Sequence, residues 1–169
     1  MRAGLLSSAP PLDAGQRRFL TVEIIVNAVA SGILSAAFVR LMFGGMALVP
    51  LWGADGLAFD LVPTTFMITL MMTLGLTLFT RWRCATGRAP RCDGRSRLPT
   101  RVWLRAPLLA AALTVLLVPA AVLLLWLAGP DIWTYGAVMV FKIVYGVALA
   151  AALTPVINLA AMRDAGSRP

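Results

Sequence analysis

Three charged side chains lie inside long apolar stretches of this chain, and charged groups in such a setting are the first candidates for chemistry. They are Glu23, Asp60 and Lys142. A charge inside a membrane-spanning helix is energetically costly and often marks a path for protons, ions or solutes. The chain of 169 residues is 60% hydrophobic and 13% charged, and it contains no His. Its polar residues are therefore few enough to be considered one by one.

Asp60 and Lys142 are expected to meet near one end of the molecule. Lys142 follows Tyr135 by seven residues, or about 10 Å along a helix. Its flexible stem can carry the ammonium outward, so we predict an Asp60–Lys142 contact. Arg40 is expected close to this pair and Thr64 just inside it. This candidate outer polar site is either a structural tie between helices or a solute or ion site that opens outward.

A second group of polar residues is expected near the opposite surface. Glu23 lies about 7 Å beyond Arg18 along a helix, and Asn27 lies one turn deeper on the same face. With two residues of the last apolar stretch, the candidate inner polar cluster is Glu23, Asn27, Thr154 and Asn158. It is either a cation or proton site, or a structural arrangement. In the structural arrangement Glu23 reaches the headgroup zone or pairs with Arg17 or Arg18, and the Asn side chains join helices by hydrogen bonds. The structural arrangement is favoured, because Glu23 does not lie at the midplane of the membrane, where burial of a charge costs most.

Four apolar stretches must position these residues, and each is long enough to cross a bilayer, which takes about 20 residues. They cover approximately residues 19–43, 61–80, 107–128 and 134–162. The pattern predicts an all-α polytopic membrane protein, a four-transmembrane-helix bundle made of two helical hairpins. Two hairpins of the same orientation form a parallel repeat about the membrane normal. The remaining segments are tails and a loop, at residues 1–18, 163–169 and 81–106.

The loop over residues 81–106 predicts the orientation. Eight arginines lie between residues 81 and 105, whereas the other two connections have no Lys or Arg in their interiors. Basic residues in short loops stay on the cytoplasmic side. We therefore expect a protein of the bacterial inner membrane with both termini on the cytoplasmic side. Lipid headgroups are the expected contacts of four of these arginines, Arg81, Arg83, Arg101 and Arg105.

The outer connection over residues 44–59 is mostly apolar. This composition predicts that it lies on the membrane interface or folds back over the bundle. At its end, Asp60 is well placed to cap the second helix, with Pro63 in the first turn.

Several classes of function lack the residues that they need. The sequence has no His and no pair of carboxylates at one depth, which acid–base or metal catalysis would need. We therefore identify no catalytic residue and expect no enzyme. Cys84 and Cys92 have no further Cys or His with which to hold zinc, and we expect no metal and no cofactor. The net charge of +8 is explained by orientation, so nucleic acid is not an expected partner.

A set of short motifs spans most of the chain: Asn27, Val49-Pro50-Leu51-Trp52-Gly53, Asp60 with Thr65-Phe66, and Phe141-Lys142 with Thr154-Pro155. In these motifs the chain resembles a group of small bacterial inner-membrane proteins of unknown function. The resemblance implies the four-helix topology and no activity.

Two kinds of function remain open. The leading one is non-enzymatic binding or transport of a small solute or lipid, as a homo-oligomer because four short helices enclose little space. The alternative is an accessory or scaffolding subunit whose Arg-rich loop docks a cytoplasmic partner protein or anionic membrane lipids. A cavity lined by Asp60, Lys142 and Thr64 would favour transport, and a solid bundle would favour the accessory role.

Overall fold

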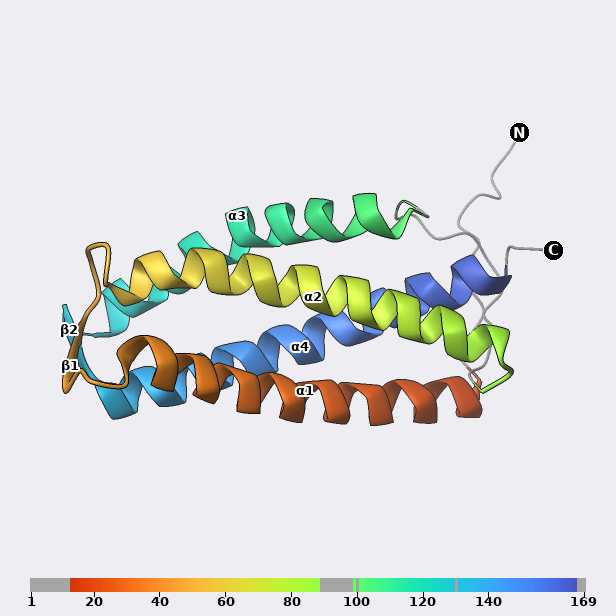
Figure 1. Ribbon diagram of the computed structural model, residues 1–169, viewed down its shortest axis with the longest axis horizontal. Coiled ribbons are helices and arrows are strands. Elements are labelled where there is room, and N and C mark those ends of the chain that lie inside the picture. Colours follow the sequence, from red (N-terminus) through yellow and green to blue (C-terminus); the bar gives the residue numbers. More distant parts are fainter. Residues whose placement is uncertain (1–12, 89–98, 100, 130, 167–169) are drawn as a thin grey trace, which may run out of the picture.

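The computed structural model describes residues 13–88, 99, 101–129 and 131–166. These residues form four long helices and two short strands (Figure 1): α1 (Ala14–Phe43), β1 (Leu48–Pro50), α2 (Leu57–Ala85), α3 (Val102–Ala128), β2 (Ile132–Thr134) and α4 (Tyr135–Gly166). Cys92 of the predicted loop lies outside the described residues.

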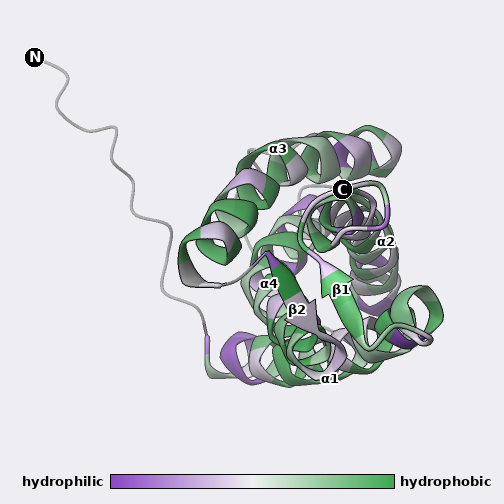
Figure 2. Ribbon diagram, turned by 90° about the vertical axis from the view of Figure 1, so that its left-hand side faces the viewer, coloured by the Kyte–Doolittle hydropathy of each residue, from purple (hydrophilic) through white to green (hydrophobic). Residues whose placement is uncertain are grey.

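Each of the four helices is long and apolar enough to span a membrane. Hydrophobic residues make up much of the helix ribbons, including the outward-facing sides visible in Figure 2. Large apolar side chains such as Ile33, Leu41, Val115 and Leu127 are more than 60% exposed. A soluble helix confines its apolar residues to a stripe that faces the core. Exposed apolar faces of this extent are typical of helices whose surroundings are lipid.

The helices are longer than the apolar stretches predicted from the sequence. Arg81, Arg83 and Arg105, which were assigned to a loop, lie in helical turns of α2 and α3. Likewise α1 begins before residue 19, and α4 continues beyond residue 162. Arginine is a good helix former, and backbone hydrogen bonding does not stop where a sequence ceases to be apolar. The predicted tails and loop are therefore shorter than expected.

The helices of the two hairpins, α1–α2 and α3–α4, pack mainly on helices of the other hairpin. In Figure 1 α2 and α4 lie in the middle of the bundle, α3 flanks α2 and α1 flanks α4. The most extensive helix contacts accordingly join α1 to α4, α2 to α3 and α2 to α4. The first helix of each hairpin thus packs on the second helix of the other hairpin. α2 and α4 run in the same direction, as a parallel repeat requires.

A two-stranded antiparallel sheet closes one end of the bundle, and the sequence did not predict it. β1 pairs with β2 in the register Leu48↔Thr134, Val49↔Trp133 and Pro50↔Ile132. The apolar connection after α1 therefore folds over the bundle end, which was one of the two predicted alternatives. Val49 and Leu51 are fully buried there, in a core with Leu57 and Val138.

Glycines make the turn after β1 possible. Gly53 has a φ of 106°, in a region that side chains other than glycine rarely adopt. A Cβ on Gly56 would approach the backbone of Trp52 to 2.7 Å. Gly56 is also the N-cap of α2. The prediction that Asp60 caps this helix is therefore wrong, and Asp60 lies in the first turn because the helix begins three residues earlier.

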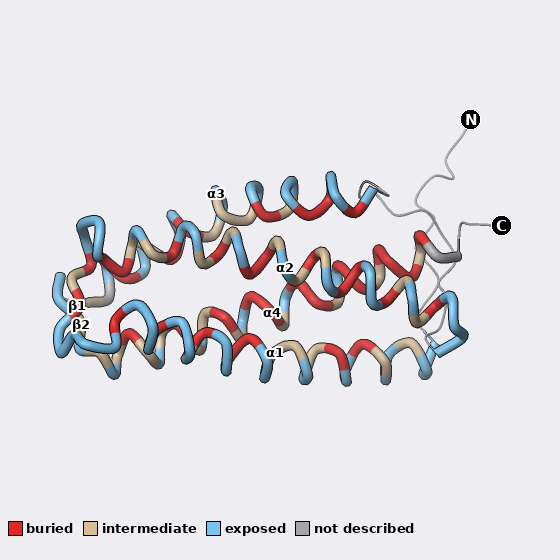
Figure 3. Tube along the Cα trace, in the orientation of Figure 1, coloured by how far each residue is buried: buried red, intermediate tan, exposed pale blue. Residues whose placement is uncertain are grey.

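Small residues bring α1 and α4 close together. Ser31 Oγ donates a hydrogen bond to the Gly146 backbone oxygen at 2.9 Å. A Cβ on Gly146 would lie 2.2 Å from Ser35 Oγ, so a larger residue fits at this crossing only if the Ser35 side chain moves. Figure 3 shows the buried positions of α1 along the side that faces α4. Small residues let the backbones of membrane helices approach closely, and this interface uses them without any ion pair among the described residues.

Candidate functional site

The predicted Asp60–Lys142 contact is present in the structure. Lys142 Nζ donates to Asp60 Oδ2 in an ion pair between α4 and α2. The same ammonium donates to Thr64 Oγ1 at 3.0 Å, and Thr64 Oγ1 lies 3.4 Å from Asp60 Oδ1. The side chain of Lys142 is only 2% exposed, and that of Asp60 is 13% exposed. The two charges therefore neutralise each other in a largely dry environment.

Arg40, in contrast, does not join this pair. It lies on the exposed side of α1 and forms no ion pair with a described residue. The prediction that Arg40 is close to the Asp60–Lys142 pair is not supported by any contact. Arg40 does not reach the pair because α1 packs with Val39 and Phe43 in the core, which leaves Arg40 on the outer side of the helix.

A small pocket opens beside Asp60 at the sheet end. Its volume is about 170 Å³, and it lies between the end of α1, the turn after β1 and the start of α2. The described residues that line it include Asp60, Asp55, Phe43 and Phe59, but not Lys142 or Thr64. Asp60 thus lines the pocket, and Lys142, whose ammonium neutralises it, does not.

A column of threonines continues from Asp60 along the buried face of α2. Thr65, Thr69, Thr73, Thr77 and Thr80 are each at most 1% exposed. They are three or four residues apart, so they stack on one face of the helix. From the first to the last, the column extends about 22 Å at the helical rise. It therefore covers most of a hydrocarbon core that is about 30 Å thick.

The two ends of the threonine column bind to α4. Thr65 Oγ1 shares a hydrogen bond of 2.7 Å with the Tyr145 hydroxyl. Thr80 Oγ1 donates to Asn158 Oδ1 at 2.8 Å, and both residues are buried. Tyr145 also stacks on Phe141, with the ring centroids 5.9 Å apart. Together with the Asp60–Lys142 pair, these bonds form a polar seam between α2 and α4.

The middle of the column is different. The hydroxyls of Thr69, Thr73 and Thr77 are buried and have no hydrogen-bond partner among the described residues. Threonine in a helix commonly donates to the carbonyl four residues earlier, and Thr154 does so here, to Ala150 O at 2.7 Å. The three column hydroxyls do not use that alternative. Buried polar groups without a protein partner are places where water or a ligand is expected.

At the opposite end, the seam finishes in a second ionic group. Asp164 Oδ2 accepts from Arg81 Nη2 and from Arg105 Nη2, each at 2.6 Å. Arg105 Nε donates to the Pro99 backbone oxygen at 2.9 Å. One carboxylate thus connects α2, α3 and α4. Asp164 was not predicted as a site residue because it was assigned to a short tail, and the only signal was its position two residues beyond the apolar stretch.

This ionic group corrects a prediction about lipid contact. Arg105 is 0% exposed, so the prediction that it contacts lipid headgroups is wrong. The guanidinium is buried because it pairs with Asp164 on the neighbouring α4. Arg101 is exposed at the start of α3, and for this residue lipid contact stays a prediction.

The candidate inner polar cluster does not form as one site. Glu23 pairs with Arg83 of α2 instead of Arg17 or Arg18. Asn27 Nδ2 donates to the backbone oxygen of Glu23 at 2.7 Å, not to its carboxylate. No hydrogen bond among the described residues joins Glu23 or Asn27 to the two α4 members, because Asn158 bonds to Thr80 and Thr154 to its own helix.

No protein-family model matches this chain, and neither a curated protein nor a solved structure matches it. The resemblance to small inner-membrane proteins therefore stays an expectation.

Proposed function

We propose that this chain is a multi-pass protein of the bacterial inner membrane that binds or transports a small solute, without catalysis, at Asp60. The sheet end is proposed to face outward, since the arginines at the other end belong in the cytoplasm under the positive-inside rule. The pocket beside Asp60 then opens to the outside. A homo-oligomer is part of the proposal, because the described bundle is filled by its own side chains.

The observation that carries the proposal is the Asp60–Lys142 ion pair between two membrane-length helices. Buried ion pairs are weak stabilisers, and well-packed apolar residues often replace them with no loss of stability. The same bundle already joins α1 to α4 with small residues. Helix packing alone therefore does not require the two charges, and a functional role explains them better.

The chemistry of the pocket indicates the class of solute. Only the carboxylate member of the pair lines the pocket. A solute with an ammonium group would compete with Lys142 for Asp60, and the phenyl rings of Phe43 and Phe59 would pack on its apolar part. A small amine or zwitterion fits a pocket of about 170 Å³.

A second candidate function is an accessory subunit that docks a partner protein or anionic lipid through its arginines. It is favoured by the burial of much of the seam, in which Thr65, Asn158 and Arg105 are 0% exposed. Native mass spectrometry of the full chain extracted in detergent distinguishes the two functions. A co-purifying subunit supports the accessory role, whereas an unaccompanied homo-oligomer supports solute binding.

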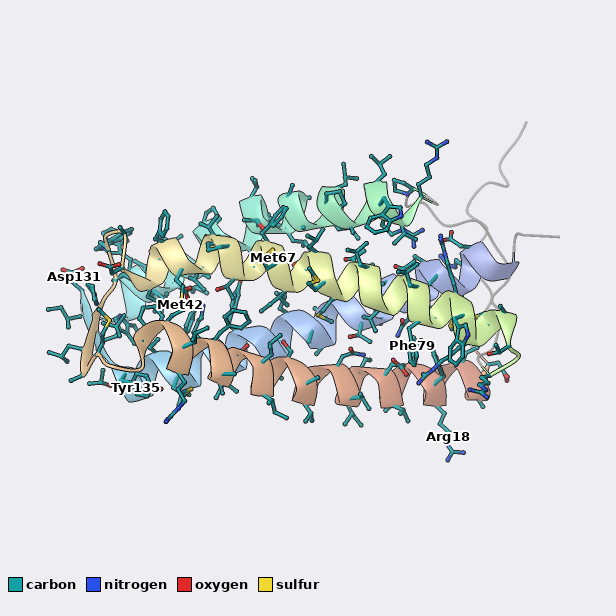
Figure 4. All side chains as sticks on the ribbon, in the orientation of Figure 1. Arg18, Met42, Met67, Phe79, Asp131 and Tyr135 are labelled. Carbon is teal, nitrogen blue, oxygen red and sulfur yellow. The ribbon has the colours of Figure 1, made fainter. Side chains whose placement is uncertain are left out.

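The experiment that tests solute binding is a thermal-shift screen of the purified chain against small amines, zwitterions and carboxylates. A ligand that binds only the folded state raises the melting temperature. We expect a shift with amines or zwitterions that Asp60→Asn abolishes and Asp131→Asn preserves. Asp131 is the matched control because it is exposed at the same end of the molecule (Figure 4) and does not line the pocket. Equal loss of the shift in both variants would refute the assignment to Asp60.

A further inference from the structure

A groove separates α1 from α2 on the surface of the bundle. These two helices pack on α4 but make few contacts with each other. The groove between them has a volume of about 520 Å³ and is wide open. Its walls are apolar along most of its length, with Val26, Met71, Leu76 and Phe79 among the lining residues. If the helices span a bilayer, this groove faces the hydrocarbon chains of the lipids.

The groove has a polar end that is cationic on its outer side. Glu23, Asn27 and Arg83 line it there. Within the Glu23–Arg83 pair the arginine is the more accessible member, with 29% of its side chain exposed against 9% for Glu23. The Arg83 guanidinium also lies over the Phe79 ring, 4.2 Å from its centroid. A ligand that approaches this end therefore meets a guanidinium before it meets a carboxylate.

Two further arginines, Arg18 and Arg88, lie at the same ends of α1 and α2 without lining the groove. Arg88 is exposed, with its guanidinium 5.4 Å from the Trp82 ring. Arg18 is exposed as well and points away from the bundle (Figure 4), whereas Phe79 lies on the side of α2 that faces α1. Clusters of arginine at the end of a membrane helix attract anionic lipid headgroups. A second copy of the chain would instead bring the same arginines close to one another.

We propose that the α1–α2 groove is a binding site for one anionic phospholipid, with an acyl chain between Met71 and Phe79 and the phosphate at Arg83 and Arg88. The apolar walls match the acyl chain, and the cationic end matches the headgroup. The inference rests on the membrane insertion contained in the proposed function, and it is independent of the solute pocket at the opposite end.

Gly75 provides a way to fill the groove without disturbing the bundle. It lines the groove, and a Cβ added there would meet no atom within 4 Å. The matched control is Gly136, an exposed helical glycine near the start of α4 whose added Cβ also meets nothing within 4 Å. Both Gly→Leu variants raise helix propensity similarly, so a difference between them reports on the groove.

The test is native mass spectrometry of the full chain titrated with phosphatidylglycerol or phosphatidylcholine in detergent. We expect the unmodified chain to retain one phosphatidylglycerol at least tenfold more tightly than phosphatidylcholine. Gly75→Leu is expected to lose this retention, and Gly136→Leu is expected to keep it. Equal retention of phosphatidylglycerol by Gly75→Leu and the unmodified chain would overturn the proposal. It would also be overturned if Gly75→Leu abolished a dimer of the chain and left lipid retention unchanged.

One double variant tests the headgroup contact. Glu23→Gln combined with Arg83→Gln removes the guanidinium without leaving an unpaired carboxylate. We expect this double variant to retain both lipids equally, whereas an unchanged preference for phosphatidylglycerol would contradict the role of Arg83. Alkaline carbonate extraction of membranes tests insertion separately. Protein that stays in the membrane but retains no lipid overturns the lipid site and leaves the proposed function standing.

Discussion

The α1–α4 and α2–α4 interfaces join helices of similar length by different chemistry. The first uses Ser31, Ser35 and Gly146 to bring two backbones close together. The second uses an ion pair at one end, a carboxylate shared by two arginines at the other, and hydroxyls between them. α4 takes part in both interfaces, so its environment alone does not explain the difference. One pair of helices in this bundle therefore packs closely through small residues, whereas the other places ionic groups at both ends of its interface.

Removal of one member of the ion pair should have the largest effect. Asp60→Leu leaves the Lys142 ammonium 2% exposed and without its carboxylate. Breaking a buried pair in this way typically costs about 3–5 kcal/mol, and we expect a loss of unfolding free energy in that range. Chemical unfolding in detergent measures it. Asp131→Leu at the same end should change stability by less than about 0.5 kcal/mol, because the residue is exposed.

The α1–α4 interface should be sensitive to volume rather than charge. Gly146→Ala places a Cβ 2.2 Å from Ser35 Oγ, and overpacking of this kind costs about 1–3 kcal/mol. We expect Ser35→Gly in the same chain to restore most of the stability, since it removes the colliding side chain. Thermal unfolding of the two single variants and the double variant decides the point. Additive losses would mean that the two residues do not meet.

A neutral bond of the seam should contribute less than the ion pair. Thr80→Val removes the donor to Asn158 Oδ1, and hydrogen bonds between membrane helices average about 0.6 kcal/mol. We expect a destabilisation of about 1 kcal/mol, because the Asn158 side chain would then be buried without its described partner. Thr21→Val is the control. Thr21 bonds to its own helix at Arg17 O, and its replacement should change stability by only a few tenths of a kcal/mol.

The smallest effect is expected in the middle of the threonine column. Thr73→Val replaces a buried hydroxyl that has no described hydrogen-bond partner with a methyl group of similar shape. Such a replacement is nearly neutral or stabilising, and the unfolding free energy in detergent should show this. A loss above about 1 kcal/mol would show that the hydroxyl holds a bound water or ligand.

The sequence was sufficient to locate the four helices and the Asp60–Lys142 pair. Length and apolar composition determine which segments can span a bilayer, and depth along a helix follows from its rise. These quantities do not require knowledge of which helices are neighbours. Asp60 and Lys142 could be matched because they carry opposite charges at similar depths near the same end of their helices, whereas Arg40, expected near them, does not join them.

The remaining contacts depend on the exchange of partners between hairpins, which no local pattern contains. Glu23 was expected to pair with Arg17 or Arg18, but α1 and α2 bring it to Arg83. The β1–β2 sheet joins segments more than 80 residues apart, and strands of three residues have no periodicity to detect. Arg105 was expected at the lipid surface because the sequence does not show that α4 carries a carboxylate beside it.

The central claim is that the Asp60–Lys142 pair serves binding rather than stability. The most direct test is the double variant Asp60→Leu with Lys142→Met, which replaces both charges with apolar side chains. We predict an unfolding free energy within about 1 kcal/mol of the unmodified chain, because apolar replacement of a buried pair is often neutral, together with complete loss of the amine-induced thermal shift. A double variant as unstable as Asp60→Leu alone, or one that still binds amines, would contradict the claim.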